Sequence, residues 1–350
     1  MGKKRSRICL LLCCICLLVA CAPARQGSAA QELQEEDKIK IGMSFDSFII
    51  ERWQRDRDVF VSTAKELGAE VNVQNANGDV EEQKNQIEYL IQKEMDVIVI
   101  ICADSDALKE SVEKANDAGV KVIAYDRLIK DAPVDLYISF DNAMVGTMMG
   151  EAFVQNGLAD GNVLMLGGPL SDHNVELVET AFRDVMMSNN VTVLDSVHAE
   201  GWRAEVAAQY IYDHPDMVAQ ADAIMCGNDN IASQVVHALA ETRLAGNIPV
   251  VGQDADLEAC QRIVEGTQIM TVYKPVEKLA EKAAEYAVAL AKGEELHWEE
   301  SDMIESGKYR IPYVALDPVS VTEENINEVI INSGFHLKED VYLNVPDKMP

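Results

Sequence analysis

The sequence is poor in basic residues: 30 Lys and Arg stand against 59 Asp and Glu among 350 residues, for a formal net charge of -29. A surface this acidic repels a phosphate backbone, which argues against a nucleic-acid-binding protein. Long apolar runs are equally scarce, since the only one extends from Ile8 to Ala20 and is too short to span a bilayer comfortably. With 48% hydrophobic and 25% charged residues, the chain is predicted to be globular, with about two domains at roughly 150 residues each.

Cysteine is too sparse in the body of the chain for a disulfide framework. Five of the eight Cys lie at or before Cys21, which leaves Cys102, Cys226 and Cys260. Cys102 and Cys226 each end an apolar run, a position more typical of a small buried hydrophobe than of a nucleophile. We therefore expect neither a disulfide net nor a catalytic thiol.

The N-terminus has the pattern of an export signal, with basic residues followed by the short apolar run. The run ends in Leu18-Val19-Ala20-Cys21, which resembles the lipobox of bacterial lipoproteins, where the cysteine thiol receives diacylglycerol and the chain is cut before it. Residues 1–20 are thus predicted to be a signal peptide, residues 21–37 a flexible tether, and Cys21 the lipid attachment site. The alternative is an ordinary signal peptide in which Cys21 is incidental.

From Lys38 onward, short β-rich runs alternate with amphipathic stretches of helical length, which predicts parallel sheets covered by helices on both faces. The expected strands are 39–45, 70–74, 97–101, 120–125, 136–140, 163–166, 192–197, 223–226, 249–252 and 270–273. The expected helices are 51–67, 80–93, 106–118, 144–155, 175–188, 203–213, 232–242, 257–264 and 276–292. The last segment is expected to hold an extended run over 313–321 and a helix over 323–331.

The alternation restarts near Asp141, which predicts two doubly wound α/β lobes. The long helix that begins at residue 276 brings no new sheet, so the chain is expected to cross back to the first lobe there. The last segment needs a further crossing. We expect a first lobe of residues 38–141 plus about 276–316, and a second lobe of residues 142–275 plus about 317–345.

Polar residues follow many of the expected strands, at the edge where open parallel sheets bind ligands. These strand-end residues are Asp46, Asp126, Arg127, Asn228, Asp229, Gln253, Asp254 and Lys274. Any one of them is about as well explained as a helix N-cap, and Asp106, Asp172 and Asp256 are further candidates for caps. Five polar strand ends spread over both halves favour a binding site.

Carboxylates beside Arg, Lys or Asn suit an uncharged polyhydroxylated molecule, because each hydroxyl both donates and accepts hydrogen bonds. A sugar also has an apolar face of C–H groups that packs on a flat aromatic ring. Trp53 and Trp202 both lie near expected strand ends and are candidate walls; the alternative is a packing role in the core or between lobes. Trp298 lies in an acidic loop and is given no role.

Support for catalysis is thin. Asp254 with Asp256, or Asp126 with Arg127, could pass for an acid and a base. However, the chain has no His-Glu-x-x-His, Gly-x-Ser-x-Gly, phosphate loop or Gly-x-Gly-x-x-Gly, and its six His are scattered without ligand spacing. We predict a protein that is not an enzyme and that needs neither a metal nor a cofactor.

Several longer runs carry a family resemblance. They are Ile41-Gly42-Met43, Glu51-Arg52-Trp53-Gln54-Arg55-Asp56-Arg57-Asp58, Tyr125-Asp126-Arg127, Tyr137-Ile138-Ser139-Phe140-Asp141-Asn142, Gly252-Gln253-Asp254-Ala255-Asp256 and Met270-Thr271-Val272-Tyr273-Lys274-Pro275. These runs resemble the D-xylose-binding proteins of bacterial ABC transporters, within the ribose and galactose type of periplasmic binding proteins. The similarity extends from about Lys38 to Leu337.

The resemblance implies two similar α/β lobes joined by three hinge strands that close on one pentose. It also implies a sugar-binding set, with two tryptophans facing the ring: Arg52, Trp53, Asp126, Arg127, Asp172, Asn174, Trp202, Asn228, Asp254 and Lys274. Two segments depart from the family pattern, because its Asp-Asn-Asn is here Asp172-His173-Asn174 and its Asp-Gly-Trp is Glu200-Gly201-Trp202. His173 is either a titrating contact or a solvent-facing residue after a cap.

The expected function is that of an extracytoplasmic, lipid-anchored protein that captures a monosaccharide, D-xylose first, by hinge closure. Its expected partners are the sugar, the permease of an ABC transporter and the membrane reached through the lipid on Cys21. The protein is expected to be a monomer that binds no nucleic acid. The alternative is a sugar sensor whose closed form engages a histidine kinase or a chemoreceptor.

Overall fold

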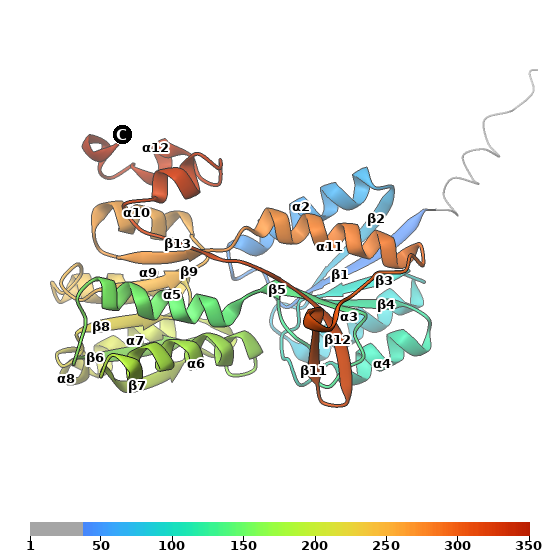
Figure 1. Cartoon of the computed structure of the whole chain (residues 1–350), viewed down its shortest axis with the longest axis horizontal. Coiled ribbons are helices and arrows are strands. Elements are labelled where there is room, and N and C mark those ends of the chain that lie inside the picture. The colour runs from blue at the N-terminus through green and yellow to red at the C-terminus, as the bar shows by residue number, and fades with distance from the viewer. Residues whose placement is uncertain (1–37) are drawn as a thin grey trace, which may run out of the picture. The chain divides into compact units, whose positions relative to one another are not determined.

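Two sheets, each flanked by helices on both faces, form the body of the protein (Figure 1). The computed structural model describes residues 38–350, so the predicted signal peptide, the tether and Cys21 lie outside the described residues. The first sheet contains β1 (Ile39–Phe45), β2 (Ala69–Asn75), β3 (Val97–Ile100), β4 (Lys121–Tyr125), β5 (Leu136–Phe140), β11 (Met303–Ser306) and β12 (Tyr309–Leu316). The second contains β6 (Asn162–Gly167), β7 (Thr192–His198), β8 (Ala223–Cys226), β9 (Val250–Gln253), β10 (Met270–Tyr273) and β13 (Val319–Val321).

Helices cover both faces of each sheet, and we call each sheet with its helices a lobe. The first lobe has α2 (Arg52–Glu66), α3 (Val80–Gln92), α4 (Lys109–Asp117) and α11 (Val276–Ala291). The second lobe has α5 (Asn142–Gln155), α6 (His173–Ser188), α7 (Glu205–Asp213), α8 (Pro215–Val218), α9 (Asp229–Glu241), α10 (Leu257–Glu265) and α12 (Lys338–Val341). Short 3-10 turns span Glu200–Trp202, Glu300–Asp302 and Pro346–Lys348.

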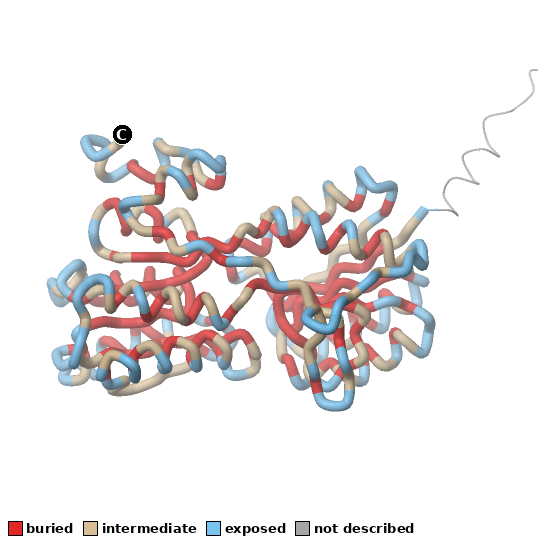
Figure 2. The backbone as a smooth tube through the Cα atoms, in the orientation of Figure 1, coloured by how far each residue is buried: buried red, intermediate tan, exposed pale blue. Residues whose placement is uncertain are grey.

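The central strands are buried because helices cover both of their faces. Strand β3 is the run Val-Ile-Val-Ile and is buried at every position, as expected for the centre of a parallel sheet. Helix α11 lies along α2, and its buried face carries Ala280, Ala283, Ala284 and Ala287, whose small side chains allow close packing. Buried residues therefore follow the strands and the inner helix faces, while outer turns are exposed (Figure 2).

Both lobes have the same strand order. The first sheet runs β11-β12-β5-β4-β3-β1-β2 and the second runs β13-β10-β9-β8-β6-β7. Strands β1 to β5 and β6 to β10 are parallel within their sheets, whereas β11 and β13 pair antiparallel. The order reverses between β1 and β3 in the first lobe and between β6 and β8 in the second. In such sheets the carboxyl ends of the strands at the reversal form a binding crevice.

The chain passes between the lobes three times: from β5 to α5, from β10 to α11, and from β12 to β13. This agrees with the expected fold of two doubly wound lobes joined by three hinge strands. The alternation of elements expected from the sequence is confirmed through α11.

The prediction for the C-terminal segment is wrong in detail. The extended run expected over 313–321 is two strands in different sheets, because Pro318 offers no N–H to continue a ladder and the chain changes lobes there. The helix expected over 323–331 is a single π-helical stretch, Asn327–Ile331. The hairpin of β11 and β12 was not expected at all.

Candidate functional site

A cavity lies between the two lobes, at the carboxyl ends of their strands. Nine of the ten residues predicted to bind sugar line it: Arg52, Trp53, Asp126, Arg127, Asp172, Asn174, Trp202, Asp254 and Lys274. The structure therefore gathers, from both lobes, residues that are up to about 220 positions apart in the chain.

The first lobe contributes two buried arginines, each held by a carboxylate. Arg52, at the start of α2, forms an ion pair with Asp126, which follows β4. Arg127 places Nη1 2.8 Å from Asp46 Oδ2 and donates to the carbonyl of Cys102 at 3.0 Å. Because these guanidinium groups are fixed by several bonds, their remaining N–H groups keep a defined direction toward the cavity.

The second lobe contributes the opposite wall. Asp172 caps α6 by accepting a hydrogen bond from the Asn174 N–H, and its other oxygen, Oδ2, lies 2.7 Å from Arg127 Nε. Trp202 Nε1 donates to the same oxygen at 3.3 Å. Asp172 is therefore both a helix cap and a residue of the cavity wall, and its contact with a sugar stays a prediction.

The lobes also touch through Asn174. Its Nδ2 lies 3.1 Å from Oδ1 and 3.1 Å from the backbone oxygen of Asp126. At the hinge side, Lys274 Nζ lies 3.3 Å from Asp254 Oδ1. The lobes are thus closed on each other in this structure, joined across the cleft by the hydrogen bonds of Asn174 and by the ion pair of Arg127 with Asp172.

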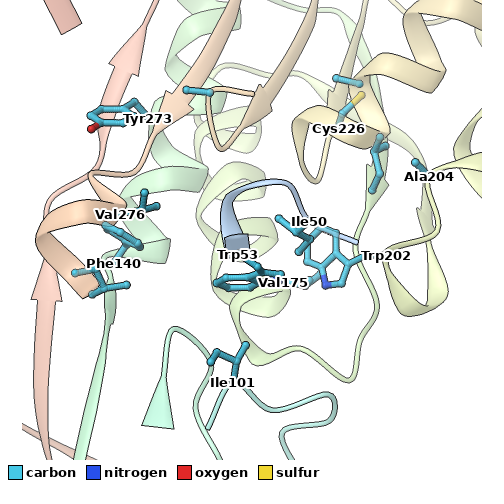
Figure 3. Packing of buried hydrophobic residues seen from close by; sticks show 14 of the residues in the cluster. Ile50, Trp53, Ile101, Phe140, Val175, Trp202, Ala204, Cys226, Tyr273 and Val276 are labelled. Atoms are coloured by element: carbon cyan, nitrogen blue, oxygen red, sulfur yellow. The ribbon is translucent and has the colours of Figure 1, made fainter. Parts of the chain in front are cut away.

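The two tryptophans come from opposite lobes and lie on either side of the cleft, with Ile50 and Val175 beside them (Figure 3). The Arg52 guanidinium stacks over the Trp53 ring at 4.1 Å from its centroid. The Trp202 ring lies so close to Gly168 that a Cβ there would come within 2.4 Å of it. Glycine at position 168 is therefore needed for this wall.

Three cavity residues have positive φ angles: Asp126 at 63°, Trp202 at 58° and Asp254 at 99°. Non-glycine residues adopt this region at a cost in free energy, and they gather where the backbone serves a binding site. In the turns after β4, β7 and β9, the backbone therefore adopts an unfavourable conformation that places these side chains in the cavity wall.

Several buried polar atoms around the cavity have neither a hydrogen bond nor an ion pair within residues 38–350. They are Arg52 Nη1, Trp53 Nε1, Arg127 Nη2 and Gln253 Oε1, whereas Arg127 Nε, Glu179 Oε1 and Asp254 Oδ1 lack hydrogen bonds but take part in ion pairs. Unpaired buried donors and acceptors are rare in folded proteins, because each costs about 1 to 3 kcal/mol. Three donors and one acceptor remain for a ligand, a set that matches hydroxyl groups.

The charges of the cavity shape its ionisation. Burial would raise the pKa of Asp126, but the neighbouring Arg52, Lys274 and Arg127 outweigh it and hold that pKa below its usual range. Burial raises the pKa of Asp172 above its ordinary value despite the nearby Arg127. Asp126 is therefore a fixed anion, whereas Asp172 depends on its contact with the other lobe.

Asn228 is the predicted residue that does not line the cavity. Its Oδ1 accepts a hydrogen bond from the Ile231 N–H at 2.9 Å and caps α9. Its role in sugar binding stays a prediction. Asp256 makes no side-chain cap bond at the start of α10, and Asp106 precedes α4 by three residues.

Other residues take part that were not in the predicted set. Gln253 and Glu179 line the cavity, and Asp46 fixes Arg127 from behind. The strand-end rule had pointed to Asp46 and Gln253, but no signal in the sequence pointed to Glu179. His173 does not line the cavity; its ring lies 3.3 Å from Glu176. The family departure at residue 173 therefore falls outside the cavity wall.

Other features of the described chain are unremarkable for a site. Cys102, Cys226 and Cys260 are free and buried, and burial raises the pKa of the Cys102 thiol to about 12. Across residues 38–350, His, Cys, Asp and Glu nowhere gather in threes in a way that could hold a metal ion. Over the same range, every helix is too short or too polar to cross a membrane.

Fold and site together define a two-lobed binding protein with its ligand space in the closed cleft. Residues 41–295 match the periplasmic binding protein domain family, and the chain belongs to that family. It is 41% identical over 309 residues to the D-xylose-binding periplasmic protein of Haemophilus influenzae, covering 87% of this chain and 92% of that one. It is 38% identical over 332 residues to the protein of the same name from Escherichia coli, covering 93% and 98%.

Solved structures share the fold. A solute-binding protein of an ABC transporter from Clostridium phytofermentans with bound β-D-glucose aligns with a TM-score of 0.78 and 27% identity, over 86% of this chain and 99% of that one. A carbohydrate transporter solute-binding protein from Chloroflexus aurantiacus with D-glucose gives a TM-score of 0.77 and 27% identity, over 87% and 98%. Membership in this family confirms the predicted fold and the prediction of a binding protein rather than an enzyme.

Proposed function

We propose that the protein captures a single monosaccharide, D-xylose before other sugars, in the cavity between its lobes. The observation that carries this proposal is the set of nine cavity residues, charged and aromatic, which come from both lobes and leave buried hydrogen-bonding atoms free. Two relatives at 38% and 41% identity are named for D-xylose, which favours a pentose. Arg52, Arg127 and Gln253 would bind the hydroxyl groups, and the two tryptophans would face the ring.

Hinge closure is the proposed mechanism. A sugar bound to the Arg52 and Asp126 side alone meets half of its hydrogen-bonding groups, and the Asp172, Trp202 and Asp254 side supplies the rest only when the lobes close. A ligand that binds the closed form more tightly shifts the population toward it. Three chain crossings between the lobes allow such a motion with small changes in backbone angles.

The closed protein would deliver the sugar to the permease of an ABC transporter, with lipid on Cys21 keeping it at the membrane on the outer side of the cell. The solved relative with bound glucose belongs to an ABC transporter, which supports this partner. We propose that the protein acts as a monomer, since one chain supplies both walls of the cavity.

Calorimetric titration of the chain from Lys38 onward tests the sugar. The titrants are D-xylose, D-glucose, D-ribose, L-arabinose and D-galactose. Tight one-to-one binding of D-xylose, with hexoses weaker by at least tenfold, is the expected result. Preference for a hexose would keep the binding mechanism and overturn the pentose assignment. No binding to any of the five sugars would overturn the proposed function.

The anchor has a separate test. Cys21→Ser in the full-length chain removes the thiol that would carry the lipid, so the protein should move from the membrane fraction to the soluble extract. Cys102→Ser is the matched control, because Cys102 is buried in the fold and should leave fractionation unchanged. If Cys21→Ser remains in the membrane fraction, the lipid assignment is wrong.

A further inference from the structure

Ser105 lies in the loop that follows β3 of the first lobe, and its side chain is fully buried. Its backbone N–H donates to the carbonyl of Ser171 at 2.9 Å, and its Oγ accepts from the N–H of His173 at 3.2 Å. Ser171 and His173 belong to the second lobe. One first-lobe residue thus bonds to the second-lobe backbone on both sides of Asp172.

None of these three residues lines the cavity, so the bonds are contacts between lobes rather than to the ligand space. Asp172, which lies between them, does line it and holds Arg127 and the Trp202 indole. The carbonyl of Ser105 also accepts from the N–H of Lys130 at 2.8 Å, which ties this loop to the segment that follows Arg127. The two lobes therefore meet here through a bridge between backbone next to Asp172 and backbone three residues after Arg127.

We propose that Ser105 is a positioning residue, which fixes the backbone around Asp172 when the lobes close and so couples closure to completion of the sugar site. The inference rests on the proposed function. In an open form the bonds to Ser171 and His173 are broken and water takes their place. Closure restores them and sets the direction of the Asp172 carboxylate. Ser105 then stabilises the closed form without touching the sugar.

Ser105→Ala removes the Oγ acceptor and keeps the backbone donor. One neutral hydrogen bond corresponds to a change of roughly 3- to 10-fold in affinity for D-xylose. The loss should appear as faster dissociation with association little changed, since the bond forms after encounter. It should be equal for every sugar that the protein binds. Ser111→Ala, a buried serine on α4 of the same lobe, is the matched control and should bind as the wild type does.

The unfolding midpoint of the sugar-free protein separates positioning from plain structural support. It should change little in Ser105→Ala, because the cross-lobe bonds are absent from the open form and the contact of Oγ that persists there, to Cys102 Sγ at 3.9 Å, is long. A lowered midpoint that accounts for the loss of affinity would overturn the proposal. A loss confined to one sugar would also overturn it, because Ser105 would then be a direct contact.

A double-mutant cycle with Asp172→Asn tests whether Ser105 acts through Asp172. Binding is measured with D-xylose up to millimolar concentrations. If Ser105 acts through Asp172, its removal should cost less in the Asp172→Asn background than in the wild type. Additive losses would overturn the coupling. A wild type that binds none of the five sugars would instead overturn the proposed function, whereas equal binding by wild type and Ser105→Ala would remove only the role of Ser105.

Discussion

Two buried polar clusters in the same molecule differ in how completely their hydrogen bonds are satisfied. The cavity cluster, formed by the nine residues between the lobes together with Gln253, leaves donors on Arg52 and Arg127 and an acceptor on Gln253 without partners in the described chain. The interior cluster lies within the second lobe and consists of Asp229, Ser233, Arg262, Gln268 and Thr271. Every buried polar side-chain atom of the interior cluster has a partner.

In the interior cluster, the donors of Arg262 are paired with acceptors inside the lobe. Arg262 donates from Nε to Gln268 at 2.9 Å, from Nη1 to Ser233 at 2.6 Å and from Nη2 to the Asp229 carbonyl at 3.2 Å. The Asp229 carboxylate accepts from Gln268, from Thr271 and from the Asp256 N–H. Burial and charge alone do not identify a binding site, because both clusters have them; the unpaired atoms do.

Removing Arg262 should have the largest effect, and on stability. Arg262→Ala leaves the Gln268 Oε1 acceptor without its donor, removes the bond to Ser233 Oγ and takes the compensating cation from Asp229, so we expect the free energy of unfolding to fall by about 3 to 5 kcal/mol. Urea denaturation of the sugar-free protein measures this. The exposed Arg183→Ala on α6 is the control and should stay within about 0.5 kcal/mol. A stable Arg262→Ala protein would break the comparison, since the interior cluster would then not be structural.

Changing Asp254 should act on binding instead. Asp254→Asn tolerates the φ of 99° but removes the charge beside Lys274, so the affinity for D-xylose should fall by about 1.5 to 3 kcal/mol, a typical value for a hydrogen bond to a charged group. Calorimetric titration measures it, with the exposed Asp216→Asn as control. If Asp254→Asn binds D-xylose as tightly as the wild type does, Asp254 is not part of the binding site. The contrast between the two clusters would then fail.

Much of the cavity was predictable because strand ends in a parallel sheet converge on one edge, and polar residues after apolar runs are visible in the sequence. Asn228 shows the limit of this rule. It follows β8 as Asp254 follows β9, yet its side chain caps a helix, and the same residue type serves both roles. Which of the two holds depends on the backbone angles of the turn, which only the folded chain sets.

The C-terminal part was less predictable for a different reason. Strand β11 is half-buried and has only two apolar residues, Met303 and Ile304, so it lacks the apolar run that marks a buried strand. The crossing at Pro318 joins strands of two sheets, and sequence periodicity carries no information on which sheet a strand enters. Ser105 was not predicted either, because a single serine in a loop forms no sequence pattern. Its role depends on its hydrogen bonds to the other lobe, which only the folded chain forms.

The smallest expected effect is a change in how the free energy of unfolding depends on pH. Asp56 lies beneath the cavity cluster on α2, fully buried, and accepts a hydrogen bond from the Tyr125 hydroxyl. Burial raises the pKa of Asp56 to about 7, against about 3.9 in an unfolded chain. The folded protein therefore keeps a proton that the unfolded chain has released, and stability from this group is lost as the pH rises from about 4 to about 7.

Asp56→Asn removes that titration and keeps an acceptor for Tyr125, so the fall in unfolding free energy between pH 5 and pH 7 should become shallower, by up to about 1.4 kcal/mol per pH unit. The effect should not vanish, because burial also raises the pKa of Asp229, in the interior cluster, to about 7. Urea denaturation at a series of pH values measures the slope, with the exposed Asp58→Asn on the same helix as control. An unchanged slope would mean that Asp56 carries no proton above pH 5 in the folded protein, as it would if Arg52 held it as an anion, and would leave the pH response to other buried carboxylates such as Asp172 and Asp229.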